Sequence, residues 1–363
     1  MKSIFICHRP YHILRSCDII KKNCNKDCEN ILFTYDVKLE KKQEYQRFET
    51  HRVFYSYFDE VVELTRQAIP SIKDLLNYFV FCKSLRKQYR KYVTKYHDVD
   101  VIYFYADDEL EIELLVGLFL EYNPKIKSIL IDEGLVTYSA VDHKHFLKVR
   151  LWLRIFKFFA GIKYFNIEQN YGYSNLYNLS LANNPEKAIY FHKPIDKLPA
   201  LSEEICKEVR GKITSKKVPD SSNPYFIYVG TYEKSFYEDL PVIEQMRAIL
   251  SKYGLGFYIK LHPQQNESLY LKQFGDQVLL EKGIPVELFF GHNAIMAGTI
   301  SSSLFNASLQ GYFAMDVSFL FPEKERKKWM QMPMSQQFDW IDVKPVSSFS
   351  QFESLIKLFL SSI

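Results

Sequence analysis

The sequence lacks any apolar run long enough to span a membrane. A spanning helix takes about 20 consecutive, mostly apolar residues, and polar or charged side chains interrupt every apolar stretch of these 363 residues before that length. The opening residues, MKSIFICHRPYH, begin a strand pattern at once and show no charged, apolar and small-residue regions of a signal peptide. We therefore expect a cytoplasmic protein without a spanning helix.

Signatures of metal sites and of common nucleotide sites are also missing. The six cysteines form no CxxC pair, and no second ligand pair follows Cys24 and Cys28 at a zinc-like spacing. Neither GxGxxG nor GxxxxGK[ST] occurs, so dinucleotide and ATP sites are not predicted. Asp98 and Asp100 stand at the start of a strand pattern rather than just after one, where a metal–diphosphate site would lie. We expect free thiols in a reducing compartment, no metal and no cofactor.

A strong charge of one sign is absent as well. Lys and Arg number 47 against 43 Asp and Glu, a net charge of +4. Nucleic-acid-binding proteins usually concentrate basic residues in a stripe, so nucleic acid is not an expected partner, whereas small anionic substrates are compatible. Aromatic residues are plentiful at 16%. Tyrosine can stack on a ring and still donate a hydrogen bond, which suits sugars and nucleosides, although core filling explains its abundance equally well.

Strand and helix patterns alternate along both halves of the chain. Strand patterns cover 3–7, 30–35, 59–64, 99–105 and 127–131, and then 225–229, 256–261 and 293–297. Such alternation predicts α/β domains with mostly parallel sheets. The polar stretch 199–223 is typical of a linker. We predict two Rossmann-like domains, 1–198 and 224–363, with a cleft between them. The final helix, 349–360, could also pack back on the first domain.

The first candidate site is Asp132-Glu133-Gly134, directly after the strand pattern 127–131. A carboxylate at a strand end can act as a general base, and glycine permits a tight turn and close approach of a substrate to the backbone. The same residues are also typical of an ordinary turn.

The second candidate is Lys260-Leu261-His262-Pro263, at the end of the strand pattern 256–261. A histidine there can stabilise or protonate a phosphate leaving group, and the proline fixes the local backbone. Lys260 is two residues before His262 and therefore lies on the same face of the strand. A structural histidine at a strand end is the alternative.

Three further elements of the second half suit nucleotide binding. Ser301, Ser302 and Ser303 precede a helix pattern, where free N–H groups and hydroxyls can hold an anion, although plain N-capping predicts the same residues. Glu287 can accept hydrogen bonds from both ribose hydroxyls. Gly230 and Thr231 follow the strand pattern 225–229, where a glycine lets a ligand approach the backbone.

The segment 143–165, HKHFLKVRLWLRIFKFFAGIKYF, is basic and aromatic with a helical period. Such a helix can lie on an anionic membrane surface. It is equally typical of a core helix with a solvated basic face.

The order of these motifs resembles the bacterial sialyltransferases: an acidic pair with glycine at 132–134, then His-Pro at 262–263, then paired serines within 301–303. The opening CHRPYHIL and the segment SSSLFNA look most like glycosyltransferase family 52, the lipooligosaccharide and capsule sialyltransferases. The resemblance implies a GT-B fold and a metal-independent, inverting transfer of sialic acid from CMP-sialic acid to a galactoside-type hydroxyl of a glycan.

The resemblance also implies residue roles. Asp132 would deprotonate the acceptor hydroxyl with Glu133 supporting it, and the choice of base between the two is open. His262 would stabilise or protonate the leaving phosphate of CMP. The substrate-binding residues that it implies are Gly134, Gly230, Thr231, Lys260, Pro263, Glu287, Ser301, Ser302 and Ser303.

Two other functions remain compatible with the sequence. One is a different GT-B transferase that uses CMP-Kdo or a UDP-hexose. The other, of a different class, is a non-catalytic protein that binds a nucleotide sugar or a glycan. A homodimer and peripheral membrane contact through 143–165 are compatible too, and the sequence indicates neither the acceptor sugar nor the linkage.

Overall fold

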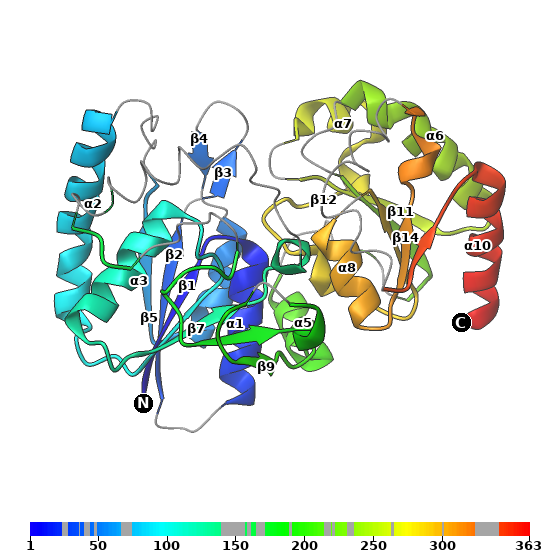
Figure 1. Cartoon of the computed structure of the whole chain (residues 1–363). Helices are drawn as coiled ribbons and strands as arrows, with labels where there is room; N and C mark the ends of the chain where they lie inside the picture. The colour runs from blue at the N-terminus through cyan, green and yellow to red at the C-terminus, as the bar shows by residue number, and fades with distance from the viewer. Residues whose placement is uncertain are drawn as a thin grey trace. The chain divides into compact units, whose positions relative to one another are not determined.

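The chain forms two compact units, shown as a computed structural model in Figure 1. The structure describes residues 1–23, 28–35, 37–39, 44–46, 49–66, 75–138, 157, 161–164, 171–188, 191–213, 219, 222–230, 236–262, 265–299, 301–323 and 341–363. Unit 1 comprises Met1–Asp36 and Phe54–Ala200, and unit 2 comprises Val37–Val53 and Leu201–Ile363.

Unit 1 is built on a parallel sheet of seven strands in the order β5-β2-β1-β6-β7-β8-β9. The strands are β1 (Lys2–Cys7), β2 (Glu29–Tyr35), β5 (Glu60–Leu64), β6 (Val101–Phe104), β7 (Lys127–Ile131), β8 (Leu179–Ala182) and β9 (Ile195–Lys197). The helices are α1 (Pro10–Lys22), α2 (Leu75–Lys95) and α3 (Leu110–Tyr122). The strand order reverses between β1 and β6, and ligands of such sheets bind outside the carboxyl ends of the strands at that point.

Unit 2 repeats this plan with six parallel strands in the order β12-β11-β10-β13-β14-β15. The strands are β10 (Tyr225–Val229), β11 (Gly256–Lys260), β12 (Leu279–Leu280), β13 (Ala294–Gly298), β14 (Phe313–Asp316) and β15 (Val343–Pro345). The helices are α5 (Glu203–Lys212), α6 (Phe236–Lys252), α7 (Glu267–Phe274), α8 (Ser302–Leu309) and α10 (Phe349–Ser362). Its order reverses between β10 and β13.

Short elements complete the two units. The 3-10 helices are η1 (Glu49–Tyr57), η2 (Leu135–Tyr138), η3 (Pro185–Lys187), η4 (Asp276–Val278), η5 (Val286–Phe289) and η6 (Ser318–Leu320). An antiparallel pair, β3 (Val37–Leu39) and β4 (Glu44–Gln46), groups with unit 2 although it precedes most of unit 1 in the sequence.

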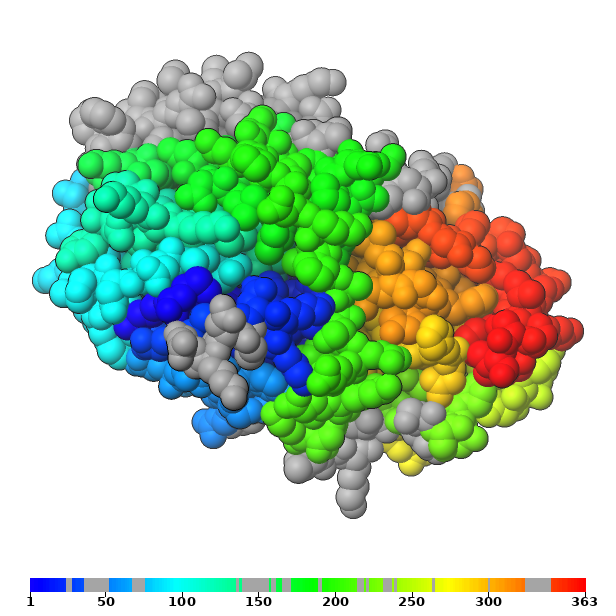
Figure 2. Space-filling model, turned by 90° about the horizontal axis from the view of Figure 1, so that it is seen from below, coloured from blue at the N-terminus to red at the C-terminus, as the bar shows by residue number. Residues whose placement is uncertain are grey.

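The end of unit 1 is attached to α1. Arg15, which is 1% exposed, donates a hydrogen bond to the carbonyl of Pro199, and Lys22 Nζ donates to the carbonyl of Ala200 at 2.5 Å. In Figure 2 blue N-terminal atoms accordingly lie beside green atoms from the middle of the chain. These contacts fix the carboxyl-terminal boundary of unit 1 on its first helix.

The final helix, α10, packs within unit 2. Its apolar face contributes Phe352, Ile356 and Phe359 to the core cluster of that unit. The Phe352 ring meets Phe226 of β10 edge-on, with the ring centroids 5.6 Å apart. The helix therefore completes the core of unit 2, where its amphipathic pattern finds an apolar partner.

The predicted linker 199–223 contains a helix. In α5 the side chains of Ile205, Cys206 and Val209 are buried, while the charged positions face solvent. Spacings of three and four residues place these apolar side chains on one helix face. The polar composition of this stretch thus reflects the exposed face of an amphipathic helix.

Most of the predicted membrane segment 143–165 lies outside the described residues. Lys157, which is described, is buried, and its Nζ contacts both carboxylate oxygens of Glu113 on α3, at 3.0 and 2.7 Å. This cation therefore pairs within unit 1. No helix in the described part of the chain has both the length and the apolar content to cross a bilayer.

Candidate functional site

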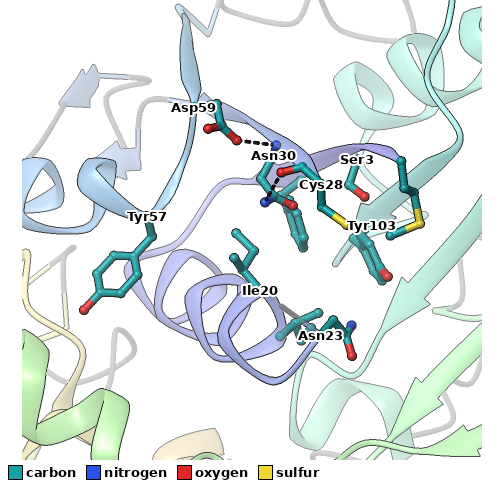
Figure 3. Close-up of a pocket in the computed structure, with 11 residues that line it drawn as sticks. Ser3, Ile20, Asn23, Cys28, Asn30, Tyr57, Asp59 and Tyr103 are labelled. Atoms are coloured by element: carbon teal, nitrogen blue, oxygen red, sulfur yellow. Dashed lines mark hydrogen bonds between the residues drawn. The ribbon is translucent and has the colours of Figure 1, made fainter. Parts of the chain in front are cut away.

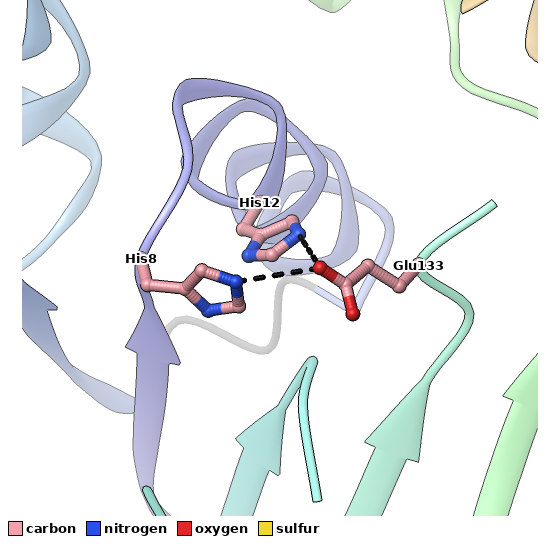
Figure 4. Close-up of side chains that lie close together, drawn as sticks. All are labelled: His8, His12 and Glu133. Atoms are coloured by element: carbon pink, nitrogen blue, oxygen red, sulfur yellow. Dashed lines mark ion pairs between the residues drawn. The ribbon is translucent and has the colours of Figure 1, made fainter. Parts of the chain in front are cut away.

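The carboxyl ends of the unit 1 strands gather a compact cluster of ionisable side chains. His8 directly follows β1, His12 lies in the first turns of α1, and Glu133 follows β7. Figure 4 shows the two imidazoles next to each other, both facing the same oxygen of the Glu133 carboxylate. Because β1 borders the point where the strand order reverses, this cluster occupies the position at which α/β sheets bind ligands.

Asp132 is buried and fully engaged by its own surroundings. Its side chain is 0% exposed and accepts hydrogen bonds from Gly134 N at 2.7 Å, from the Tyr138 hydroxyl, and from the backbone N and the Nδ2 of Asn183, both at 2.9 Å. Burial raises the pKa of Asp132, and the hydrogen bonds from Tyr138, Asn183 and Gly134 oppose that rise. The carboxylate of Asp132 therefore holds the turn after β7 in place.

Glu133 presents a carboxylate oxygen with no hydrogen-bond donor. Its side chain is 6% exposed, and Oε1 lies 3.0 Å from Arg9 Nη1, 3.3 Å from His8 Nε2 and 3.8 Å from His12 Nε2. In the described residues Oε1 nevertheless makes no contact with hydrogen-bond geometry. Its backbone N donates to Thr137 Oγ1 at 2.9 Å, which fixes the residue without using the carboxylate. Glu133 is therefore the member of the acidic pair that is available for chemistry.

Gly134 allows the two carboxylates to be placed differently. Its φ is +94°, a conformation that side chains other than glycine rarely adopt. The chain turns there into η2, so that Tyr138 reaches back to Asp132. The prediction that glycine permits a tight turn here is confirmed.

His12 is buried against an aromatic ring. It is 0% exposed and stacks on the Tyr105 ring at 4.2 Å with an interplanar angle of 5°. Burial lowers the pKa of His12 well below its ordinary value, and the nearby His8, Arg9 and Arg66 lower it further. Neither ring nitrogen of His12 has a hydrogen-bond partner in the described residues.

A second opening in unit 1 lies at the other end of the sheet. Figure 3 shows a pocket of about 210 Å³ near the amino ends of the strands, beside Ser3, Asn30 and Asp59. There Asn30 N donates to Asp59 Oδ2 at 2.7 Å, and the Asn30 side chain donates to the Cys28 carbonyl at 3.3 Å. Since α/β sheets bind ligands at their carboxyl ends, we do not assign the candidate site to this pocket.

In unit 2 the predicted residues again lie at carboxyl ends of strands. Gly230 follows β10, and His262 lies two residues after β11. The Gln265 side chain joins them: its Oε1 accepts from His262 N at 2.9 Å, and a Cβ at position 230 would lie 2.1 Å from this oxygen. Glycine at 230 thus leaves room for the carboxamide that positions the backbone of His262. Thr231 and Pro263 lie outside the described residues.

Lys260 is engaged by two backbone carbonyls. Its Nζ is buried and donates to the carbonyls of Glu281 at 2.9 Å and Lys282 at 2.8 Å. Burial lowers the pKa of Lys260 to about 7. The ammonium therefore ties the end of β11 to the chain after β12.

The three serines before and within α8 have separate tasks. Ser301 caps the helix by accepting a hydrogen bond from Ser303 N at 3.2 Å. The Ser303 hydroxyl donates to Glu287 Oε1 at 3.2 Å, and Asn306 Nδ2 donates to the same oxygen at 3.3 Å. Within the described part of the chain, the Ser302 hydroxyl makes no hydrogen bond and the Ser301 hydroxyl only accepts one, so both keep an O–H to donate, whereas that of Ser303 is used by Glu287.

Glu287 is part of this arrangement rather than a surface residue. It is 5% exposed, and burial raises its pKa, while the hydrogen bonds from Asn306 and Ser303 and the charge of Lys260 oppose the rise. The structure thus brings Glu287 and Ser303 into contact. Both were predicted to bind the nucleotide, but a contact between them was not predicted.

Residues 3–310 match the family model described as alpha-2,8-polysialyltransferase (POLYST). The chain belongs to this family. The resemblance to sialyltransferases is therefore confirmed at the level of the family, and glycosyl transfer is the chemistry that goes with it. The narrower likeness to glycosyltransferase family 52 stays a prediction. A comparison with curated protein sequences gave no match.

Solved structures similar to this family member support the fold. The kitacinnamycin glycotransferase matches with a TM-score of 0.51 at 11% identity, over 99% of this chain and 90% of that one. The UDP co-structure of MnaA from S. aureus matches with a TM-score of 0.50 at 11% identity, over 87% of this chain and 79% of that one. At such identities the likeness concerns the fold alone. With the two parallel sheets, it confirms the predicted GT-B fold of two Rossmann-like domains.

His8, Arg9 and His12 were not predicted from the sequence as site residues, although they belong to the motif CHRPYHIL. A signal was present, because His8 and Arg9 directly follow the first strand pattern, and the carboxyl end of a central parallel strand is where ligands bind. His12 carried no such signal, since its place depends on the orientation of α1.

Proposed function

We propose that this protein is a metal-independent, inverting sialyltransferase with CMP-sialic acid as donor and a glycan hydroxyl as acceptor. Family membership supports sialyl transfer. The observation that carries the proposal is the Glu133 carboxylate, buried at the carboxyl end of the unit 1 sheet with an oxygen that accepts no hydrogen bond within the described residues. A general base needs such an oxygen in order to take a proton.

Each unit has its own part in the proposed reaction. Glu133 accepts the proton of the acceptor hydroxyl as the acceptor oxygen forms a bond to the anomeric carbon. The bond from that carbon to the phosphate oxygen of CMP breaks, so the β-linked donor becomes an α-sialoside. In unit 2, His262 protonates or stabilises the departing phosphate, and Ser302 with the N-terminus of α8 holds it.

The absence of a metal in the proposal has a chemical reason. CMP leaves with a single phosphate, and less negative charge develops on it than on a nucleoside diphosphate. An imidazole, a hydroxyl and helix N–H groups can stabilise that charge without a metal. We assign ribose recognition to the region of Glu287, whose second carboxylate oxygen is not used by Ser303 or Asn306.

The acceptor class follows from the family rather than from the site. The family description names an α2,8 linkage, which favours a hydroxyl of a terminal sialic acid. The resemblance to family 52 instead implies a galactoside-type hydroxyl. Both acceptors present a secondary alcohol that a carboxylate base can activate, so the proposed chemistry is the same for either.

Incubation with CMP-sialic acid and an acceptor panel tests the proposal. We expect CMP release that depends on an acceptor, that EDTA leaves unchanged, and that yields a sialoside whose linkage is read by NMR. The panel contains lactose, a sialylated lactose and an oligosialic acid. Turnover only with CMP-Kdo or a UDP-hexose would show that CMP-sialic acid is not the donor. Nucleotide binding without turnover would indicate a non-catalytic protein.

The phosphate-binding role of α8 predicts unequal effects of its serines. Ser302→Ala should weaken CMP binding about 10- to 150-fold, since a hydrogen bond to a charged group contributes about 1.5–3 kcal/mol. Ser303→Ala should cost less affinity, because that hydroxyl is committed to Glu287. Isothermal titration calorimetry with CMP measures both. Ser308→Ala, near the other end of the same helix, is the matched control, and equal losses in all three variants would contradict the assignment.

A further inference from the structure

Three side chains at the carboxyl end of the unit 1 sheet converge as metal ligands do. His8, His12 and Glu133 each offer one ligand atom, and these atoms all lie within 4.8 Å of one another. Two ligands bound at about 2.05 Å to a tetrahedral cation lie about 3.3 Å apart. Glu133 Oε1 is 3.3 Å from His8 Nε2 and 3.8 Å from His12 Nε2. Small side-chain rotations would therefore give a common coordination distance.

The same atoms lack hydrogen-bond partners. Both ring nitrogens of His8, both of His12 and Oε1 of Glu133 are buried and make no hydrogen bond in the described residues. His8 is 5% exposed, His12 0% and Glu133 6%. Their contacts with one another are ion pairs at 3.3 and 3.8 Å, outside hydrogen-bond geometry. Buried polar side-chain atoms nearly always have a hydrogen-bond partner in the protein or in bound solvent, so five such atoms in one cluster favour a bound ligand.

The donor set favours a particular class of cation. Two imidazoles and one carboxylate, with a fourth position open, form a set that binds zinc in proteins. Imidazole also suits cobalt, nickel and copper, whereas magnesium and calcium prefer oxygen ligands.

One cation of the protein competes for this position. Arg9 Nη1 lies 3.0 Å from Glu133 Oε1, but the Arg9 side chain is 50% exposed. It can turn into solvent when a divalent cation takes its place beside the buried Glu133 carboxylate. Glu109 Oε1, 3.4 Å from His8 Nε2, adds negative charge next to the cluster.

We propose that His8, His12 and Glu133 bind one divalent cation of the zinc class. Binding occupies the carboxylate oxygen that the proposed function uses as a base, so the cation inhibits transfer instead of assisting it. The site itself does not depend on the proposed function; only the inhibition rests on it.

Titration of the full chain with Co²⁺ tests the site through its visible absorption, with a calorimetric titration of Zn²⁺ beside it. We expect one equivalent to bind and to give d–d bands without the near-ultraviolet charge-transfer absorption of a cobalt thiolate. His12→Gln and, separately, His8→Gln should each lower the affinity by about 10–100-fold or more, since even loss of an outer partner of a metal ligand costs that much. Arg9→Gln should raise the affinity. Circular dichroism confirms that each variant is folded.

His97→Gln is the matched control, because His97 is an exposed histidine on the same unit. Equal Co²⁺ affinity in the control and in both ligand variants would overturn the site, as would thiolate charge-transfer bands, which would place the cation on cysteine. Zn²⁺ should also inhibit CMP release, and EDTA should restore it. Cobalt binding without any transferase activity would reject the proposed function but support the metal site. Transferase activity without cobalt binding would reject the metal site but support the proposed function.

Discussion

Replacing Glu133 with glutamine should lower the rate of sialyl transfer by about 10²- to 10⁴-fold, the usual contribution of a general base. Glutamine keeps the size of the side chain but has no oxygen basic enough to take the acceptor proton. The effect should appear in kcat, because Glu133 lies in unit 1 and the nucleotide is assigned to unit 2. Initial rates of CMP release at saturating donor and acceptor measure the loss.

Two controls separate this result from a loss of structure. Glu203→Gln removes an exposed carboxylate of α5 that pairs with Lys207 at 3.1 Å, so it should leave the rate unchanged. Glu133→Gln should keep the CMP affinity of the wild type, because the nucleotide is assigned to unit 2, and should stay folded, because the ion pair that it loses involves the half-exposed Arg9. A Glu133→Gln variant with full activity would exclude Glu133 as the base.

The order of elements and the position of the acidic motif were predictable from the sequence. Buried parallel strands give nearly continuous apolar runs, and β1, β7 and β10 are such runs. Ligand-binding residues follow parallel strands, which placed 132–134, 262 and 301–303 correctly at strand ends or a helix start. Short strands such as β9, of which two residues are exposed, carry no apolar run and were not predicted.

The separate roles of the residues within each motif were not predictable from the sequence. Asp132 and Glu133 are adjacent carboxylates, and their roles are set by Tyr138 and Asn183, which reach Asp132 from other parts of the chain. The same holds for Lys260, expected among the substrate-binding residues, whose acceptors are carbonyls about 20 residues farther along. Hydrogen bonds between distant segments depend on the tertiary structure, so no local pattern reports them.

Unlike Glu133, Asp132 accepts several buried hydrogen bonds, so its replacement should have a large effect on the stability of the fold. Asp132→Ala should lower the free energy of unfolding by about 3 kcal/mol or more, because each buried donor left without an acceptor costs about 1–3 kcal/mol. Four donors, from Gly134, Tyr138 and Asn183, would lose their acceptor in a position that solvent does not reach. Urea unfolding followed by circular dichroism measures the change.

Asp132→Asn and Asp342→Ala complete this comparison. The asparagine keeps one acceptor oxygen but turns an amide N–H₂ towards the remaining donors, so its loss of stability should be intermediate. Asp342 is 83% exposed and pairs only with Lys344 in the described residues, so its removal should change stability by no more than about 0.5 kcal/mol. If Asp132→Ala unfolded like the wild type and yet had no transferase activity, Asp132 rather than Glu133 would be the base, and the hydrogen bonds that surround it would have to open during turnover.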